Sequence, residues 1–344
     1  MQIKNILYLL LIVLCYSCTQ SSEKKHFNFR KNIVNVRDKV KEIEIEDVLI
    51  GRFSTCYIID QYLIIIDTES YDKVIHLFDK NNFNYVTSTA DRGPGPRELT
   101  VPGEIGVNEK DRIFYASDHG KQLIYCFELD SVLDNPKYYP KETIKMDKTQ
   151  FPSNYLYIND TLSIGRFILP IGNGDYRPSV AKWNMLTGDV TLLNKNDHPK
   201  IEWKRAVFSA SYEQGIFVEC YSHHDLMAIC DLDGNLKYYI YGSQWDNTRQ
   251  NRIRFFSDVS FCRDKIVALY APGEDNFVRD KDGRIIGGIN PSKFIIFDIH
   301  GDFIQTLETG YQISRFCYDS EKNRIIMILD DMIQFAYLDM DEIL

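Results

Sequence analysis

The sequence lacks a long apolar run and a sustained helical pattern. Its longest apolar stretch near the N-terminus, Ile6 to Leu14, spans nine residues, whereas a membrane-spanning helix requires ~20. Beyond that stretch, no window of the length of a helix keeps apolar residues at i, i+3, i+4 and i+7. These absences argue against a transmembrane anchor and against an α-helical domain.

The sequence also has no pair of cysteines with the spacing typical of a metal-binding or redox-active site. None of the six cysteines after the leader forms a CxxC motif. In the predicted hairpin around "SHHD", Cys220 should lie opposite Met227 and Cys230 opposite Phe217, so the two thiols do not meet. We therefore predict unpaired, mostly apolar environments for Cys56, Cys126, Cys220, Cys230, Cys262 and Cys317.

Common catalytic motifs are absent as well. There is no G-x-S-x-G elbow and no H-E-x-x-H helix, and "DLDGN" places its glycine too early for a calcium loop. The formal net charge of −9 argues against nucleic-acid binding. What the chain does have is apolar material, because 44% of its residues are hydrophobic and 13% aromatic. It can bury a large core.

The N-terminus has the pattern of an export signal. Lys4 precedes the apolar stretch, and small Ser17 stands immediately before Cys18. We interpret residues 1–18 as a signal peptide with a lipobox-like cysteine, Cys18, as the lipidation site; an ordinary cleaved signal is the alternative. Residues 19–32 are polar and aperiodic, which predicts a flexible tether. The localisation predicted is export and lipid anchoring to the bacterial cell envelope, either periplasmic or on the outer-membrane surface.

Residues 33–344 show a repeated pattern of short strands rich in β-branched and aromatic residues. Six times an apolar strand ends in an acidic or amide residue, followed by a tight turn and another strand. The intervals between these polar residues run from 41 to 67 positions, close to the ~40 to 50 residues of a propeller blade. The six residues are Asp79, Glu128, Asn184, Asp231, Asp298 and Asp339.

This repeat predicts an all-β fold, a single six-bladed β-propeller of four-stranded antiparallel blades. The last repeat ends at Leu344 without room for its outer strand. The alternating segment Lys39 to Leu49 can supply that strand, so we predict that an N-terminal strand closes the ring and removes an open sheet edge. A pair of β-sandwiches would explain the strands but not their regular spacing.

The loop "GPGPRE", Gly93 to Glu98, follows the first blade. Together with six blades and an export signal ending in cysteine, it resembles the TolB-like six-bladed propeller lipoproteins of Bacteroides-type bacteria, whose Gly-Pro-Gly-Glu loop it matches apart from Pro96 and Arg97. The resemblance implies a cell-envelope protein and brings no catalytic residues. The loop itself cannot cradle phosphate, because its prolines remove backbone donors.

Arginines and tryptophans gather in loops that a propeller places on one face. Arginine grips carboxylate or phosphate in a bidentate manner, and tryptophan offers a flat apolar surface to sugars or peptides. We therefore predict a non-catalytic binding or scaffolding module that recognises an anionic glycan or peptide on this face. The candidate ligand-binding residues are Arg92, Arg97, Glu98, Arg166, Trp203, Trp245, Arg252 and Arg254. Solvated loop charges with packed tryptophans are the alternative.

Two further functions remain open at this level. One is a propeller hydrolase or lactonase with a divalent cation at the axis, for which Asp118, Glu274 and Asp330 could supply carboxylates. The other is a structural partner in an envelope protein complex. No cofactor is expected unless the protein is such a hydrolase, which would bind a divalent cation. The predicted partners are the membrane, through the lipid anchor, and a glycan, peptide or envelope protein.

Overall fold

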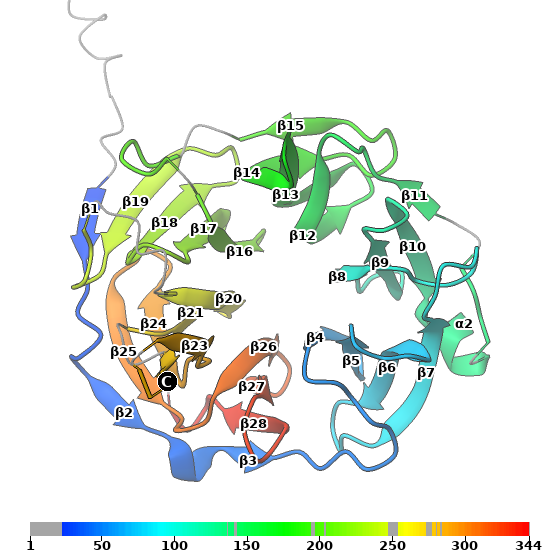
Figure 1. Ribbon diagram of the computed structural model, residues 1–344, viewed down its shortest axis with the longest axis horizontal. Helices are drawn as coiled ribbons and strands as arrows, with labels where there is room; N and C mark the ends of the chain where they lie inside the picture. Colours follow the sequence, from blue (N-terminus) through cyan, green and yellow to red (C-terminus); the bar gives the residue numbers. More distant parts are fainter. Residues whose placement is uncertain are drawn as a thin grey trace, which may run out of the picture.

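Short apolar strands pair into six sheets that stand in a ring around a central axis (Figure 1). The computed structural model describes residues 23–135, 137–140, 143–193, 197–202, 204–246, 254–272, 277–279, 281–282 and 284–343. Each sheet contains four antiparallel strands of one blade, with the first strand of the blade innermost. The predicted six-bladed β-propeller is confirmed.

The blades follow one another along the chain. Blade 1 consists of β4 (Ser54–Ile59), β5 (Tyr62–Asp67), β6 (Lys73–Asp79) and β7 (Tyr85–Asp91). Blade 2 consists of β8 (Pro102–Asn108), β9 (Ile113–Asp118), β10 (Leu123–Glu128) and β11 (Thr143–Lys145). Blade 3 consists of β12 (Phe151–Asn159), β13 (Leu162–Gly172), β14 (Asp175–Trp183) and β15 (Val190–Leu192). Blade 4 consists of β16 (Ala206–Ser211), β17 (Ile216–Tyr221), β18 (Leu226–Asp231) and β19 (Leu236–Tyr241). Blade 5 consists of β20 (Phe256–Cys262), β21 (Lys265–Tyr270), β24 (Lys293–Asp298) and β25 (Phe303–Glu308). Blade 6 consists of β26 (Ile313–Asp319), β27 (Arg324–Leu329), β28 (Phe335–Asp339) and the N-terminal strand β3 (Lys41–Glu42).

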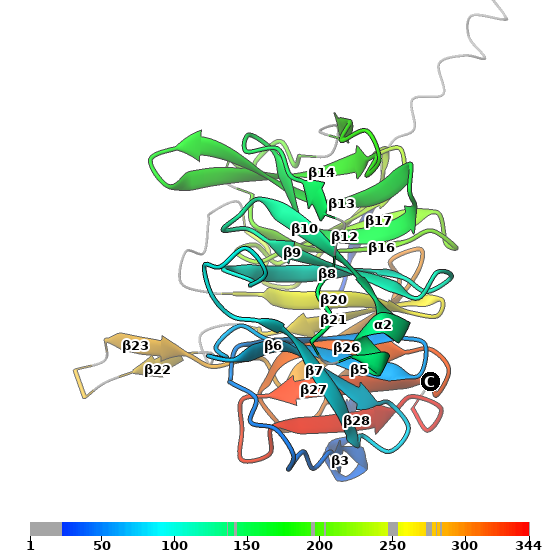
Figure 2. The same cartoon turned by 90° about the vertical axis from the view of Figure 1, so that its right-hand side faces the viewer.

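This strand order gives the ring two different faces. Links between blades and the turns between second and third strands lie on one side, which we call the loop face; the remaining turns lie on the opposite side, the turn face. A hairpin of β22 (Phe277–Arg279) and β23 (Ile285–Gly288) extends from blade 5 on the loop face (Figure 2).

The polar residues that marked the repeat have a common structural role. Each ends, or directly follows, the third strand of its blade. In four blades the side chain accepts hydrogen bonds from backbone N–H groups of the next turn; the carboxylate of Asp231, for example, accepts from Asp233 at 3.0 Å and Asn235 at 2.8 Å. Such Asx turns explain why Asp or Asn recurs at this position. The turn glycines Gly188, Gly234 and Gly301 have φ near +81°, as the hairpin turns require.

The N-terminal strand closes the ring as predicted. β3 pairs antiparallel with β28, with Lys41 opposite Tyr337 and Glu42 opposite Ala336. The pairing continues one bond further, from the N–H of Ile43 to the carbonyl of Phe335 at 2.9 Å. The outer edge of blade 6 is therefore covered by the beginning of the domain.

The predicted tether at residues 19–32 is wrong from Glu23 onward. β1 (Glu23–His26) pairs parallel with β19 of blade 4, and β2 (Ile33–Asn35) pairs parallel with β25 of blade 5. Between them the side chains of Phe27 and Phe29 are buried in the core. The polar composition of this segment gave no indication that it packs against the domain, because only two aromatic side chains, Phe27 and Phe29, attach it to the core. The propeller therefore begins at Glu23 or earlier.

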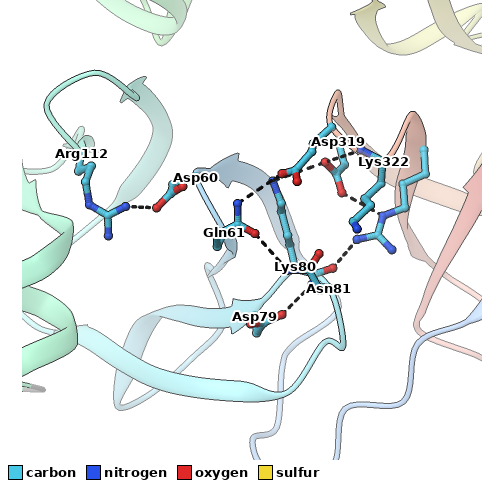
Figure 3. Close-up of polar contacts among 10 residues, drawn as sticks. Asp60, Gln61, Asp79, Lys80, Asn81, Arg112, Asp319 and Lys322 are labelled. Atoms are coloured by element: carbon cyan, nitrogen blue, oxygen red, sulfur yellow. Dashed lines mark hydrogen bonds and ion pairs between the residues drawn. The ribbon is translucent and has the colours of Figure 1, made fainter.

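A buried charge cluster joins blades 6 and 1 on the turn face (Figure 3). The Nζ atom of Lys80 lies 3.8 Å from Asp319, and Nε of Arg324 lies 3.0 Å from the same carboxylate. All three side chains are less than a tenth exposed. Lys80 also pairs with the more exposed Glu321 at 2.7 Å. This cluster, which we call the seam cluster, holds the first blade against the last.

Helical structure is limited to two short pieces in the described part of the chain. They are the 3-10 helix η1 (Arg37–Lys39) and α2 (Leu129–Asp134), whose Leu129 and Val132 are buried between blades 1 and 2. No helix among the described residues has the length and apolar character to cross a membrane. The six cysteines are free, and Cys220 and Cys230 face Met227 and Phe217 as predicted.

Candidate functional site

The glycine-proline loop that suggested a binding site is braced by its own residues. One carboxylate oxygen of Glu98 accepts a hydrogen bond from the N–H of Gly95 at 2.6 Å. The ammonium of Lys121 donates to the carbonyls of Gly95 and Glu98. Gly93, at φ +155°, lies so close to Glu98 that a Cβ there would be 2.1 Å from its carboxylate. Glu98 therefore shapes the loop.

The two arginines of this loop differ in their contacts. The guanidinium of Arg97 lies 5.8 Å from the ring centre of Tyr139, whose hydroxyl donates to the carbonyl of Pro96 at 2.8 Å. Nη1 of Arg92 is buried and has no hydrogen-bond partner among the described residues. None of Arg92, Arg97 and Glu98 lines the axial cavities found in that part of the chain.

Of the two candidate tryptophans, the structure describes Trp245. Trp245 is half-buried and packs against His198, His224 and Tyr241, with ring centres 5.1 to 5.9 Å away. Trp203 and Arg252 lie outside the described residues. Arg166 and Arg254, in contrast, both line the axial cavity.

The main cavity runs along the axis and is lined by all six blades. Its volume is about 720 Å³, and a second cavity of about 530 Å³ forms its mouth on the loop face. Thr55, Glu104, Arg254 and Arg315 line both. We call this continuous space the axial channel. A ligand entering from the loop face would meet these four side chains first and then pass inward.

β-Bulges direct charged side chains toward the channel. The inner strands of blades 2, 3, 5 and 6 each lose register near their loop-face end, whereas those of blades 1 and 4 pair regularly. Glu104, Asp258 and Arg315 lie at three of these irregularities. A bulge turns a side chain out of the regular alternation, and bulges are frequent beside functional sites.

Three guanidinium groups line the channel without carboxylate partners. Nε of Arg166 donates to Ser153 at 3.0 Å and Nη1 to the carbonyl of Ala206 at 2.6 Å, so it is held in place. Nη1 of Arg315 donates to the carbonyl of Ser314 at 3.1 Å. No carboxylate oxygen of the described chain lies within 4.0 Å of Arg166, Arg254 or Arg315. Each retains donors for a ligand.

Two carboxylates face these arginines. Glu104 accepts a hydrogen bond from the hydroxyl of Tyr57, and burial together with this carboxylate raises the pKa of Tyr57. Burial raises the pKa of Asp258 to about 6, although Arg315 opposes the shift. Burial alone would lower the pKa of Arg315, but the charges of Asp258 and Glu104 hold it above the usual arginine value. Glu109 is a third acid in the lining, so Arg166, Arg254 and Arg315 meet three carboxylates, and the excess of positive charge lies at the mouth, where Arg254 and Arg315 face Glu104.

The donor set does not suit an axial divalent cation. A propeller metal site needs carboxylates from several blades, but the described lining has acids from blades 2 and 5 only, beside the five guanidiniums of Arg52, Arg166, Arg205, Arg254 and Arg315. No group of three potential ligands gathers anywhere in the described chain. Asp118 accepts four hydrogen bonds from backbone N–H groups, Asp330 pairs with Arg52, and Glu274 lies outside the described residues.

Exposed apolar side chains are concentrated on the loop face. Of the twelve large apolar side chains that the described chain exposes, eight lie on the loop face. These are Leu49, Phe53, Tyr71, Val101, Ile171, Tyr176, Val278 and Met332. Clustered exposed apolar side chains mark interaction surfaces. The loop face therefore combines a positively charged channel mouth with exposed apolar side chains.

Sequence reasoning missed Tyr57, Glu104, Asp258 and Arg315. A signal for three of them was present, because each interrupts an otherwise apolar inner strand with a charge: "VPGEIGVN", "FFSDVSFC" and "QISRFCYD". The bulges that direct these charges are set by the pairing of strands and leave no sequence motif.

Comparison with known proteins supports the fold. Residues 44–165 match the family model DUF5128, described as a 6-bladed beta-propeller. No curated protein matches the sequence. A solved member of the DUF4221 family from Bacteroides vulgatus is 10% identical, with a TM-score of 0.56 over 88% of this chain and 98% of that one.

Two other solved structures are similar to the same degree. A Bacteroides fragilis protein described as exported is 10% identical, with a TM-score of 0.53 over 92% of this chain and 99% of that one. A luciferin-regenerating enzyme is 10% identical, with a TM-score of 0.54 over 87% of this chain and 94% of that one. Since one fold carries many functions, these likenesses describe architecture only. The chain is a six-bladed β-propeller that shares its architecture with proteins of Bacteroides and with an enzyme.

Proposed function

We propose that this protein is an exported envelope module that binds an anionic glycan or an acidic peptide in its axial channel. The observation that carries the proposal is the convergence of Arg166, Arg254 and Arg315, from three different parts of the ring, on one cavity of about 720 Å³. Guanidiniums with free donors in a partly dry site form strong, directional hydrogen bonds to carboxylates, sulfates and phosphates.

The neighbouring arginine supports this assignment by contrast. Arg205 also lines the cavity, but its Nη2 pairs with Asp175 at 2.8 Å and its guanidinium stacks on Tyr176 at 4.2 Å. The guanidinium of Arg205 is therefore already engaged by partners within the protein. Arg254 is exposed at the mouth and has no hydrogen-bond acceptor among the described residues. It would be the first cation to meet an anionic ligand.

A lipid anchor on Cys18 would orient the binding face away from the membrane. β1 starts at Glu23, which pairs with Tyr238 near the turn-face end of β19. The four residues between Cys18 and Glu23 can span about 14 Å when fully extended. The anchor would thus hold the turn face toward the bilayer, as we propose for a lipoprotein resembling the TolB-like propellers, and leave the channel mouth open to ligands.

Binding of defined anions tests the proposal. Isothermal titration calorimetry would use a sulfated oligosaccharide and a hexaglutamate peptide, with a desulfated oligosaccharide and hexaglutamine as neutral counterparts. We expect at least one anion to bind and its counterpart to bind at least tenfold more weakly. Arg254→Ala and Arg315→Ala should each weaken binding about tenfold or more, since a hydrogen bond to a charged group contributes ~1.5–3 kcal/mol.

Arg97→Ala serves as the matched control, because Arg97 lies on the same face but outside the channel. It should bind like the wild type. Equal binding of charged and neutral probes, or binding that survives both channel substitutions, would remove the channel as the site. Loss of binding in Arg97→Ala alone would place the site on the glycine-proline loop.

Binding should also strengthen as the pH falls. Asp258, whose pKa is about 6, faces Arg315 and Glu104, and above that pH its carboxylate repels an anion. Protonation removes this repulsion, on the order of 1 kcal/mol at an effective dielectric of about 20. The affinity for the sulfated oligosaccharide, whose own charge is constant, should therefore rise about fivefold between pH 7.5 and pH 5. Asp258→Asn should bind tightly at both pH values; an unchanged pH dependence in this variant would contradict the assignment.

A further inference from the structure

Two cysteines meet where the ring closes. Cys56 lies on β4, the inner strand of blade 1, and Cys317 lies on β26, the inner strand of blade 6. These strands are neighbours in space although 261 positions separate the two residues in sequence. Both side chains belong to one apolar cluster at the junction of the two blades, and both line the axial channel.

The two thiols lie at the same junction and act on each other. Both belong to the apolar cluster between the inner strands β4 and β26, which are in contact, and Cys317 raises the pKa of the Cys56 thiol. Cys220 and Cys230, in contrast, lie opposite Met227 and Phe217 on the adjacent strand. Cys56 and Cys317 are therefore a pair that neighbouring strands bring together, as a disulfide requires.

We propose that Cys56 and Cys317 form a disulfide that locks blade 1 to blade 6 once the protein is in an oxidising compartment. In this step two S–H bonds are broken and one S–S bond forms. Two protons and two electrons pass to an oxidant of the disulfide class, which becomes a dithiol. The assignment does not depend on the ligand proposed for the channel.

The location explains what such a bond would do. Apart from side-chain contacts, the ring is closed by the short pairing of β3 with β28. A disulfide at the inner strands would fasten the same junction from the other side. It would also close a loop of most of the domain, and long loops lose the most unfolded-state entropy when they are cross-linked.

The channel gives small reagents access to the pair. Cys56 is 6% exposed and Cys317 is half-buried, and both contribute to the wall of the cavity. The hydrogen bond from Cys317 and burial raise the pKa of Cys56, whereas Arg315 acts in the opposite direction. Since the thiolate is the reactive form, oxidation without a catalyst should be slow at pH 7 and faster at higher pH.

Peptide mapping tests the proposal. The full-length protein would be exported to a bacterial periplasm, alkylated, and digested with trypsin without reduction; a second sample, purified reduced, would be treated with diamide. Cleavage at Arg52, Lys73, Arg315 and Lys322 isolates residues 53–73 and 316–322, each with one cysteine. We expect these two peptides as one linked species, two mass units lighter than their sum, that disappears on reduction.

A stability measurement keeps the test independent of any single variant. The oxidised wild type should melt several degrees above its reduced form, and reduction should leave the melting temperature of Cys56→Ser and Cys317→Ser unchanged. Cys230→Ser, a buried control outside the pair, should keep the redox-dependent difference. Free thiols at both positions after export and diamide, linkage to any other cysteine, or equal melting of the oxidised and reduced wild type would each overturn the proposal.

Discussion

Replacing Asp319 with asparagine is expected to lower the free energy of unfolding by about 3–5 kcal/mol, because it leaves buried Arg324 without its carboxylate partner and Lys80 with only the exposed Glu321. The side chain of Asp319 is 0% exposed and faces Nε of Arg324 at 3.0 Å and Nζ of Lys80 at 3.8 Å. Asparagine has nearly the same shape, so packing is preserved and the effect reports on charge. Urea denaturation followed by tryptophan fluorescence and circular dichroism would measure it.

Glu321→Gln is the matched control within the seam cluster. Its carboxylate also pairs with Lys80, at 2.7 Å, but the side chain is 54% exposed. Exposed ion pairs contribute about 0–1 kcal/mol, so this variant should lose no more than that. Equal effects of the two substitutions would show that the cluster is solvated and does not hold the first and last blades together.

Phe27→Ala is expected to cost about 3–5 kcal/mol of unfolding free energy, the usual range for a buried phenylalanine. Phe27 is 5% exposed, and its ring lies 5.2 Å from that of Phe297 and 5.7 Å from that of Tyr270. The substitution would leave a cavity beneath the N-terminal strand, between blades 4 and 5. Thermal and urea denaturation of the mature chain would provide the value.

Phe53→Ala supplies the comparison, since Phe53 is 63% exposed on the loop face. A surface substitution of this kind changes stability by about 0.5 kcal/mol or less. If Phe27→Ala were equally mild, residues 23–32 would behave as the tether that their polar composition predicts. The two variants thus separate a structural N-terminal segment from a flexible one.

The sixfold repeat could be recognised in the sequence because it arises from hydrogen bonds between residues that are close together along the chain. Asp79, Asp231 and Asp298 each accept hydrogen bonds from the backbone of the turn that follows them, and such turns depend on neighbours in sequence. The same locality made the positive φ of Gly188, Gly234 and Gly301 predictable. Ring closure by Lys41 and Glu42 followed from counting strands, since an open edge had to be paired.

The candidate site was only partly predictable. Arg166 and Arg254 were identified as loop-face arginines, and they do line the channel. Arg92, Arg97 and Glu98 drew attention through an unusual motif, yet none of them lines the channel: Glu98 bonds within its own loop and Arg97 lies against Tyr139. Whether a residue reaches the axis depends on bulges in strand pairing, as at Glu104, Asp258 and Arg315, and on distant partners.

By itself the sequence determined the six-bladed ring, its turns, its unpaired cysteines in the hairpin of blade 4, and the strand that closes it. These features arise from apolar alternation and from hydrogen bonds between residues a few positions apart. Only the tertiary structure decided that three arginines share one cavity, that Phe27 is core, and that Cys56 and Cys317 lie in one cluster. Each of these joins parts of the chain that are far apart in sequence, so their energies depend on how the blades pack.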